Sequence, residues 1–458
     1  MKIIVDPTGA LDGGLATLRA ELTLPGAFPD GVIAAAEAAA RRVPDAHVDR
    51  TAMPFLTLDP EGATDLDQAF AIEAAGGDLL LHYAIADVGW FVTAGDPLDT
   101  EAWKRGATMY FPDGRIGLYP PVLSEGAASL LPDGERPAVI FTVRIGADGN
   151  AAIDGVERAL IRSRAKLAYE TATEADLPEG FAELARRVQA AEAARGAARV
   201  DPPEQEVTRD EAGGYTLAFR PRPKAEADNA ALSLAANLAV GQLLMAHRTG
   251  LFRVMAEPDP RAVRRLRETA KALGLDWPKR TPLDNFERRL DPNKPVDAAF
   301  MLAVRRGSPG ASYAPFAQGE TPWHAAVAAT YAHATAPLRR LADRYVVEAA
   351  LAVANGRPVP NEEAFARLPK VMARADALGG RIDRAAIDLA EAVMLQGRIG
   401  ETFAAVVTDT DERGARIQLT DVPVVARVAA QAEPGDTLQV RLDAVDLTRR
   451  TIGFSPVH

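Results

Sequence analysis

The chain has no cysteine among its 458 residues. Disulfide bonds and thiolate metal sites are therefore excluded, and any metal must be held by oxygen or imidazole ligands. The start of the chain lacks a positively charged leader followed by an apolar core, so we expect no secretory signal. The longest apolar stretch, 230–246, is interrupted by Asn237 and Gln242, and we expect it to fall short of a membrane span. These absences favour a cytoplasmic protein that does not associate with membranes.

Basic residues are in the minority as well. The sequence contains 52 Lys and Arg against 63 Asp and Glu, which gives a net charge of −11. A protein that coats nucleic acid indiscriminately usually presents a broad basic surface, so this class is disfavoured. A locally basic channel is still compatible with the sequence, because 251–306 carries 13 Lys and Arg against 8 Asp and Glu. A solvated helix face explains that stretch equally well.

The hydrophobic pattern predicts a sheet followed by a largely helical half. Length favours two to four domains, and the composition is that of a globular protein. Apolar runs of strand length predict strands at 55–58, 69–74, 79–88 and 138–145. Helical periodicity predicts helices at 15–22, 29–42, 177–197, 225–248, 261–273, 338–354 and 362–395. This order predicts an α+β fold rather than repeated βαβ units.

The character of the sequence changes again near residue 397. Five short strands separated by turn residues are predicted at 403–407, 415–419, 423–428, 437–442 and 451–454. Five strands in such a short segment are typical of a small Greek-key β-barrel of the OB type. We therefore expect three parts: a short helical region at 1–45, an α+β domain at 46–396 and an OB-fold at 397–458.

An acidic cluster follows the first predicted strand. Asp65 and Asp67 lie two residues apart, so in extended backbone their side chains project to the same side, and Asp59 lies at the strand end. Mg²⁺ prefers oxygen ligands and is usually held by one or two carboxylates together with phosphate and water. An EF-hand is excluded, because its sixth and twelfth positions would be Thr64 and Phe70. A polar turn remains the alternative reading.

Guanidinium groups occur together in a second string, 331–343, which contains Arg339 and Arg340. The planar fork of arginine matches two oxygens of a phosphate, which lysine does less well. A carboxylate cluster that binds a hard cation and an arginine that binds phosphate together suggest metal-assisted chemistry on a phosphodiester.

Several segments resemble, in the same order, the catalytic domain of the RNase II family. They run from Arg50 to Asp59, from Asp65 to Asp67, from His82 to Val88, from Leu98 to Asp113, from Ala165 to Tyr169 and from Tyr331 to Asp343. The resemblance covers roughly residues 27–395, and the predicted barrel resembles the ribosomal S-one type of RNA-binding OB-fold. It implies a magnesium-dependent exoribonuclease, alternatively using Mn²⁺, that threads single-stranded RNA 3′ end first. Such enzymes release nucleoside 5′-monophosphates processively.

The resemblance also implies roles for individual residues. Asp59, Asp65 and Asp67 would hold the metal ions or orient the attacking water. Arg339 would contact the scissile phosphate. Gln68 stands where the family usually has a fourth aspartate, and an amide oxygen can still ligate a metal. Asp383 stands in the register of a catalytic glutamate, although its side chain is one methylene shorter.

Further positions are expected to contact RNA. Tyr110 and Tyr169 match aromatic channel positions, where stacking holds a base without sequence preference, and core tyrosines are the alternative. The short basic run of Arg220, Arg222 and Lys224 would track the RNA backbone, although a solvated loop is equally plausible. Arg340 would contact a neighbouring phosphate, or form a structural ion pair. His333 is expected to be packed or hydrogen-bonded, and Asp343 to orient the arginines or the helix start.

The departures at Gln68 and Asp383 keep an alternative open, namely a catalytically weak or silent RNA-binding protein that uses the same channel. Retention of Asp59, Asp65, Asp67 and Arg339 favours the enzyme. A metal-dependent phosphodiesterase of small substrates is disfavoured by the barrel and the channel tyrosines. The expected partner is single-stranded RNA, bound by a monomer that requires no other protein.

Overall fold

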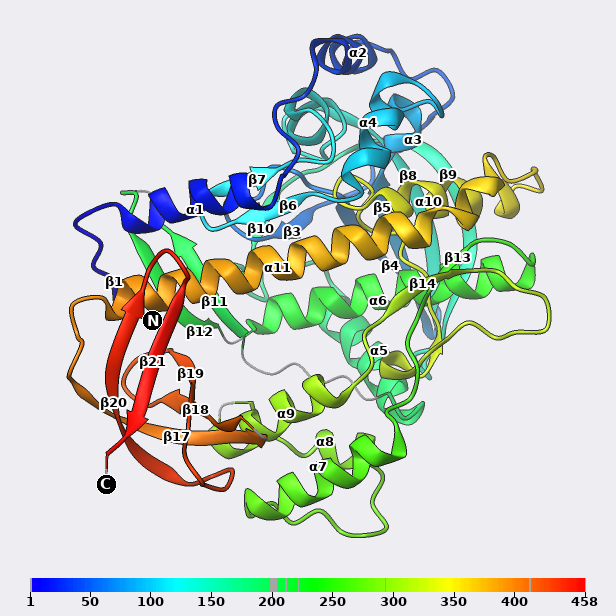
Figure 1. The fold of residues 1–458 in the computed structure, drawn as a ribbon. Coiled ribbons are helices and arrows are strands. Elements are labelled where there is room, and N and C mark those ends of the chain that lie inside the picture. Colours follow the sequence, from blue (N-terminus) through cyan, green and yellow to red (C-terminus); the bar gives the residue numbers. More distant parts are fainter. Residues whose placement is uncertain are drawn as a thin grey trace.

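A five-stranded sheet organises the first half of the chain (Figure 1). The computed structural model describes residues 2–197, 204–210, 212–220, 222–292, 294–411 and 413–457. In spatial order the strands are β2 (Val48–Asp49), β9 (Ala151–Arg162), β8 (Glu135–Ile145), β5 (Asp78–Ala86) and β4 (Gln68–Ala75). β2 is parallel to β9, and the other neighbours are antiparallel. The strands predicted at 69–74, 79–88 and 138–145 are confirmed as β4, β5 and β8.

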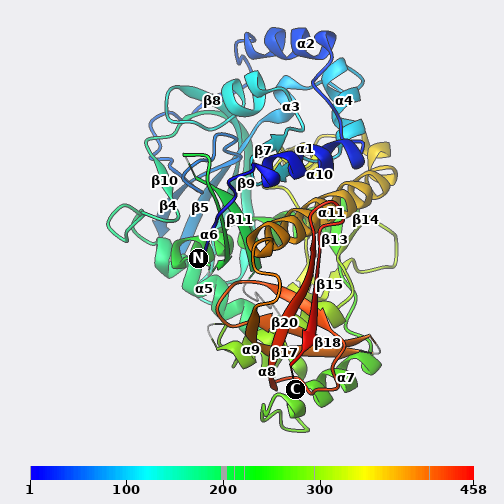
Figure 2. The same cartoon turned by 60° about the vertical axis from the view of Figure 1, so that its left-hand side comes forward.

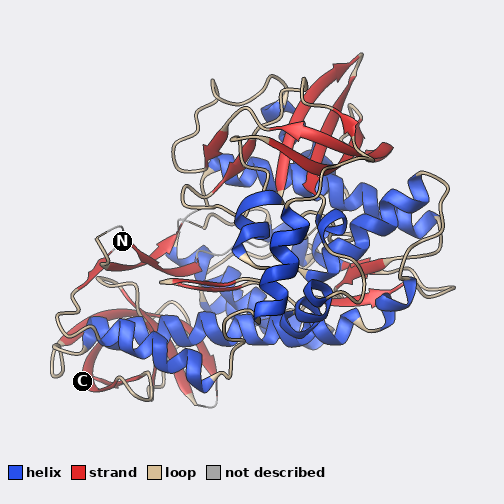
Figure 3. Cartoon of the chain, turned by 90° about the horizontal axis from the view of Figure 1, so that it is seen from above, coloured by secondary structure: helices blue, strands red, loops and turns tan. Residues whose placement is uncertain are grey.

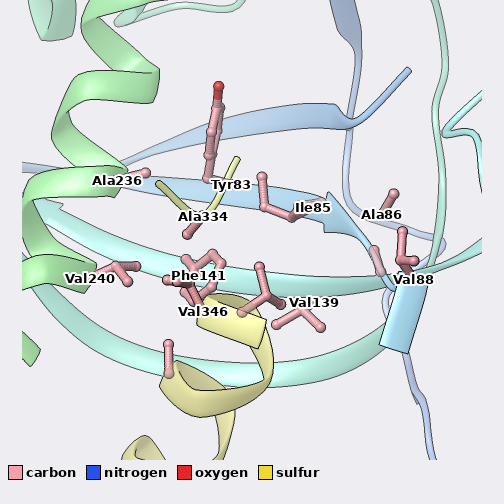
Figure 4. Close-up of a cluster of buried hydrophobic side chains, with 14 of the residues drawn as sticks. Tyr83, Ile85, Ala86, Val88, Val139, Phe141, Ala236, Val240, Ala334 and Val346 are labelled. Carbon is pink, nitrogen blue, oxygen red and sulfur yellow. The ribbon is translucent and has the colours of Figure 1, made fainter. Parts of the chain in front are cut away.

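Alanine-rich helices pack against this sheet. They are α5 (Phe181–Ala194), α6 (Lys224–Ala246) and α10 (Leu341–Ala354). Figure 4 shows Phe141 of β8 in the shared core together with Val240 of α6 and Val346 of α10. Each such side chain contributes about 1.5–3 kcal/mol when it is fully buried. The sheet and these helices therefore form a firm base for the loops at the strand ends.

Helix α6 corrects one sequence expectation. The stretch expected to fall short of a membrane span lies in a helix of 23 residues that is long and apolar enough to cross a membrane, by length and composition alone. However, 67% of its most apolar window is buried inside the fold, against β8, β9 and α10. A core helix satisfies the same test, because a helix that is apolar all round can be buried in protein.

The longest helix, α11 (Leu368–Leu395), crosses the molecule towards the barrel (Figure 1 and Figure 2). It packs on α1 (Ala10–Glu21) and on a small sheet that the sequence did not predict, with β12 (Tyr215–Arg220) between its two other strands. Those strands are β1 (Lys2–Ile4) and β11 (Glu204–Arg209). The remaining helices near the N-terminus are α2 (Asp30–Ala40), α3 (Val88–Phe91) and α4 (Pro97–Arg105).

A group of three helices has its own small core. These are α7 (Pro260–Ala272), α8 (Leu283–Glu287) and α9 (Pro295–Gly307). Trp277, Phe286 and Phe300 are in mutual ring contact at its centre. Two strand pairs flank the group in sequence: β13 (Leu251–Val254) with β14 (Ser312–Pro315), and β15 (Trp323–His324) with β16 (Ala329–Thr330).

The C-terminal segment is a closed five-stranded barrel, as predicted. Its strands are β17 (Thr402–Asp411), β18 (Gly414–Leu419), β19 (Val425–Val428), β21 (Thr451–Pro456) and β20 (Thr437–Asp446). Figure 1 and Figure 3 show helices lying between this barrel and the five-stranded sheet. The barrel core is formed by alternate apolar side chains, such as Val407, Ile417 and Leu442. The α+β class and the OB-type barrel are therefore confirmed.

Candidate functional site

Asp59 ends a short strand beside the central sheet. This strand, β3 (Thr57–Asp59), is parallel to β10 (Lys166–Ala168), and the amide of Tyr169 donates to the Asp59 carbonyl at 3.1 Å. Among the described residues none donates a hydrogen bond to the Asp59 carboxylate. Burial raises the pKa of Asp59 to about 6, against the attraction of Arg339, and the charge of Asp65 adds to the rise. The carboxylate thus has charge to share with a cation.

Asp67 is buried and links two distant parts of the chain. One of its oxygens accepts from the Leu338 amide at 2.7 Å, and the other accepts from Nε of Arg339 at 2.6 Å. Burial raises the pKa of Asp67 to about 7, and the ion pair with Arg339 opposes that rise. Backbone bonds reinforce the link, because the amide of Thr108 donates to the Arg339 carbonyl at 2.9 Å. Arg339 is therefore fixed at its inner end.

The outer end of Arg339 is free for a ligand. Its side chain is 36% exposed, and only Nε forms a hydrogen bond with a described residue. The charge of Asp59 also acts on this guanidinium, which places Arg339 near that carboxylate. Two terminal NH₂ groups in a planar fork are suited to two oxygens of one phosphate.

Asp65 is held from the other side by a β-hairpin. The hairpin consists of β6 (Met109–Phe111) and β7 (Gly114–Ile116). Nη1 of Arg115 lies 2.6 Å from one Asp65 oxygen, and the Tyr110 hydroxyl donates to the other at 3.0 Å. The Tyr110 side chain remains 46% exposed, so its ring can receive a ligand.

Tyr169 lies on the opposite flank. Its hydroxyl accepts from the side-chain amide of Asn229 at 3.0 Å, and Asn229 also donates to the Leu58 carbonyl. The negative charge of Asp59 acts on Tyr169, which shows that the phenol is near the cluster. The ring is partly buried against the main core, and its contact with RNA stays a prediction.

Gln68 points its amide oxygen towards α6. That oxygen accepts hydrogen bonds from the hydroxyls of Tyr83 and Ser233, the latter at 2.9 Å. The two hydroxyls also lie 2.6 Å apart. Both lone pairs of the oxygen are therefore in use, so a role for Gln68 as a metal ligand requires it to exchange these bonds.

A divalent cation fits the oxygen donors in part. The described residues include no set of three or more acidic or histidine side chains placed to share one metal ion. The convergence of Asp59, Asp65 and Asp67 therefore stays a prediction. Asp59, whose carboxylate accepts no hydrogen bond from a described residue, and its neighbour Asp65 are the ligands that suit Mg²⁺, which commonly takes one or two carboxylates plus water and substrate phosphate.

Arg340 forms a structural ion pair, which was one of the two roles expected for it from the sequence. Its Nε and Nη2 bind both oxygens of Asp343 at 2.8 and 2.6 Å. Asp343 is fully buried and also accepts from the Ala336 amide at 2.9 Å, and the charge of Arg340 contributes to a lowered pKa of Asp343. His333 is hydrogen-bonded to Tyr313 at 2.9 Å, as expected. Contact of Arg340 with RNA stays a prediction.

The basic run before α6 is paired with acidic side chains. Arg220 lies 3.3–3.4 Å from Glu170, Glu206 and Glu226. Arg222 pairs with Glu226, and Lys224 pairs with Asp228. These pairs reduce the net positive charge offered to a phosphate. Tracking of the RNA backbone by these residues stays a prediction.

Asp383 lies on the exposed side of α11. Burial raises its pKa, and the charge of Glu204 on β11 adds to the rise. The acidic cluster is not among the charges that act on it, so the described structure does not bring Asp383 to the other site residues. Its catalytic role stays a prediction.

Sequence reasoning missed Arg115, Glu125 and Asn229. For Arg115 a signal was present, because Pro112-Asp113-Gly114 is a turn sequence typical of a hairpin. A hairpin around that turn places Arg115 opposite Tyr110, which is the register observed. Glu125 and Asn229 come from segments without such a signal.

Comparison with known proteins points to one family. The family model described as "RNB domain" matches residues 47–354, and the model described as "RNase II-type exonuclease C-terminal S1 domain" matches 401–457. Ribonuclease R of Aquifex aeolicus is 28% identical, and the match covers 95% of this chain and 69% of that protein.

Solved structures share the fold. Mycoplasma genitalium RNase R in complex with ribose-methylated single-stranded RNA has a TM-score of 0.86 at 18% identity, covering 100% of this chain and 79% of that one. Yeast Ssd1, a pseudonuclease, has a TM-score of 0.70 at 18% identity, covering 93% and 56%. Because the RNB model alone matches more than half of its length, the chain belongs to the RNase II (RNB domain) family of exoribonucleases.

Proposed function

We propose that this protein is a processive 3′-to-5′ exoribonuclease that hydrolyses single-stranded RNA to nucleoside 5′-monophosphates with the help of Mg²⁺. The Asp67–Arg339 pair carries the proposal. It holds, near Asp59, a guanidinium whose two NH₂ groups bond to none of the described residues. An arginine preorganised next to acidic side chains is the arrangement that phosphodiester hydrolysis requires.

The chain's own residues divide the work. Asp67 fixes the inner end of Arg339, whose outer NH₂ groups bind the phosphate as negative charge develops on its oxygens. The Tyr110 ring stacks on a base near the reacting end, and Tyr169 borders the other flank. Asp59 and Asp65 would hold a divalent ion, which supplies a more acidic bound water and compensates phosphate charge.

The surroundings of the site support RNA as the polymer. The barrel is of a type that binds single-stranded nucleic acid, and the tyrosines offer stacking without sequence preference. The proposal includes a monomer acting in the cytoplasm, with RNA as its partner. Light scattering after size-exclusion chromatography measures the oligomeric state.

A silent RNA-binding protein is the second candidate. Gln68 favours it, because this neutral side chain is bound to Tyr83 and Ser233. The fold alone does not establish cleavage, since the pseudonuclease Ssd1 shares it.

One assay separates the two candidates. The protein is incubated with 5′-labelled single-stranded RNA in Mg²⁺, alongside the variants Asp67→Asn and Glu61→Gln. Glu61 is an exposed acid of the same loop and serves as the matched control. We expect progressive shortening from the 3′ end with the wild type and Glu61→Gln, and none with Asp67→Asn. Binding without shortening, in both Mg²⁺ and Mn²⁺, would show that the enzyme proposal is wrong.

A further inference from the structure

The β6–β7 hairpin holds Asp65 with two side chains at once. Tyr110 and Arg115 face each other across the hairpin as paired residues, so their side chains emerge on the same face. The Tyr110 hydroxyl binds one oxygen of Asp65 at 3.0 Å, and Arg115 binds the other at 2.6 Å. The exposed ring of Tyr110 and the Asp65 carboxylate are therefore parts of one hydrogen-bonded unit.

Arg115 is braced by other segments. Its Nη2 lies 2.9 Å from a Glu125 oxygen, its Nε donates to Glu125 at 3.3 Å, and Nη2 also donates to the Thr64 hydroxyl. Thr64 and Glu125 bind each other at 3.1 Å. Nε, Nη1 and Nη2 of Arg115 therefore all form hydrogen bonds within the protein.

The brace continues into the buried part of the fold. The Ser129 hydroxyl donates to the Thr64 carbonyl at 2.7 Å and accepts from the Leu66 amide at 2.9 Å. The Leu130 amide donates to the Leu66 carbonyl at 2.9 Å. The acidic loop, the hairpin and the segment 123–130 therefore meet at Arg115.

We propose that Arg115 is a positioning residue that fixes the base-stacking ring of Tyr110 relative to the metal-binding carboxylate of Asp65. This inference rests on the proposed function. An enzyme that removes one nucleotide after another must return each new 3′ end to the same place before cleavage. A shift of about 1 Å in such a site costs on the order of a hundredfold in rate. Arg115 limits that shift without touching the RNA.

The role requires arginine and not only a positive charge. Nη1 of the guanidinium binds Asp65, whereas Nε binds Glu125 and Nη2 binds Thr64. Lysine carries a single ammonium on a flexible stem and cannot span all three partners in fixed geometry. Arg115→Lys therefore keeps the charge near Asp65 but releases the hairpin.

Arg19 provides a matched control. It binds both oxygens of Asp113 at the tip of the same hairpin, with Nη1 at 2.9 Å, and it makes no contact with Asp65. Arg19→Lys loosens the hairpin at its far end. A purely structural effect on the hairpin would therefore appear in both variants, and an effect specific to Asp65 would appear only in Arg115→Lys.

The test measures stacking and cleavage separately. RNA carrying 2-aminopurine at its 3′ end is bound in a buffer with chelator, and the quenching of its fluorescence reports stacking on Tyr110. Single-turnover rates and KM are then measured in Mg²⁺. For Arg115→Lys we expect clearly weaker quenching and a kcat reduced by about tenfold or more, with KM within about threefold of wild type. Arg19→Lys should match the wild type in quenching and kcat.

Three outcomes decide the matter. Quenching and kcat of Arg115→Lys equal to those of Arg19→Lys overturn the inference. If the wild type does not cleave RNA but the quenching difference is seen, the proposed function fails and the positioning role stands. If Arg115→Lys unfolds, Glu125→Gln removes the brace without touching Asp65, and a smaller loss of quenching in the same direction is required.

Discussion

In the proposed function, Arg339 acts through the shape of its guanidinium as much as through its charge. Nε is bound to Asp67, and neither terminal NH₂ group forms a hydrogen bond with a described residue. We expect Arg339→Lys to lower the single-turnover cleavage rate by roughly 10²–10³, the typical loss when a preorganised donor to the transition state is removed. Quenched-flow measurement on labelled RNA gives the rate. The control is Arg162→Lys, because Arg162 at the end of β9 forms an exposed ion pair with Glu135 of β8. Equal rates for the two variants would contradict the role of Arg339.

As a proposed metal ligand, Asp59 sets a pH limit on cation binding. Burial raises its pKa to about 6, so below that pH the carboxyl is mostly protonated and neutral. Because a metal binds the ionised form, we expect the Mn²⁺ affinity to fall by about tenfold per pH unit below pH 6 and to level off above it. Calorimetric titrations at pH 5, 6 and 7.5 check this. Asp59→Asn should bind weakly at every pH, and an unchanged affinity at pH 5 in the wild type would exclude Asp59 as a ligand.

The start of α10 is organised by Asp343. This buried carboxylate binds Arg340 through two bonds and also holds the Ala336 amide, which fixes the segment that carries Arg339. Asp343→Ala leaves the partly buried Arg340 without its partner, and we expect a loss of about 3–5 kcal/mol in the free energy of unfolding. Urea unfolding measures it. Asp343→Asn should lose less, and a change below about 1 kcal/mol in Asp343→Ala would mean that water replaces the pair.

The start of α10 also differs from the sequence prediction. Helical periodicity predicted a helix from 338, but α10 begins at Leu341, because the Leu338 amide is bound to Asp67 and Arg340 has extended backbone. Helical periodicity shows which face of a helix is apolar. It does not show which backbone amides bind side chains of distant segments. The boundary therefore depended on a contact between distant segments.

Strands were predicted best where apolar residues run between turns. All five barrel strands meet that condition and were found. β9 was missed because its sequence, from Ala151 to Arg162, mixes charged residues into a strand with one face partly in solvent. β11 was missed for a similar reason, since Glu204–Arg209 is mostly polar and depends on pairing with β12.

In the site, the sequence identified Asp59, Asp65, Asp67 and Arg339 as a group. The charges of Asp59 and Asp67 act on Arg339, and the convergence of the three carboxylates on one cation stays a prediction. The supporting residues could not be predicted in the same way. The role of Arg115 follows from its contacts, and its partners come from two separate segments, 64–65 and the segment that contains Glu125.

At the scale of the whole molecule, the barrel is attached through a buried acid. An oxygen of Glu391 on α11 accepts from the Val425 amide of β19 at 2.8 Å and from the Gln205 side chain at 2.7 Å. Burial raises the pKa of Glu391 to about 8, well above its ordinary value of 4.5. The folded state therefore favours the protonated form, and this contribution to stability is full below pH 4.5 and is lost as the pH rises to about 8.

We expect Glu391→Gln to weaken this pH dependence, because the amide keeps the accepting oxygen and cannot ionise. Urea midpoints at pH 5.5 and 8.5 should differ less for Glu391→Gln than for the wild type. Glu433→Gln, at an exposed position of the barrel, should behave as the wild type. Identical pH dependence in all three proteins would show that Glu391 does not titrate in this range.

The bond between Asp67 and the Leu338 amide joins residues 271 positions apart. A ribosome delivers the first of them long before the second. Until the later segment has been synthesised, the acidic loop lacks both its guanidinium and its backbone donor, and the growing polypeptide has no complete reaction centre. The Asp67–Arg339 pair therefore forms only late in the synthesis of the chain.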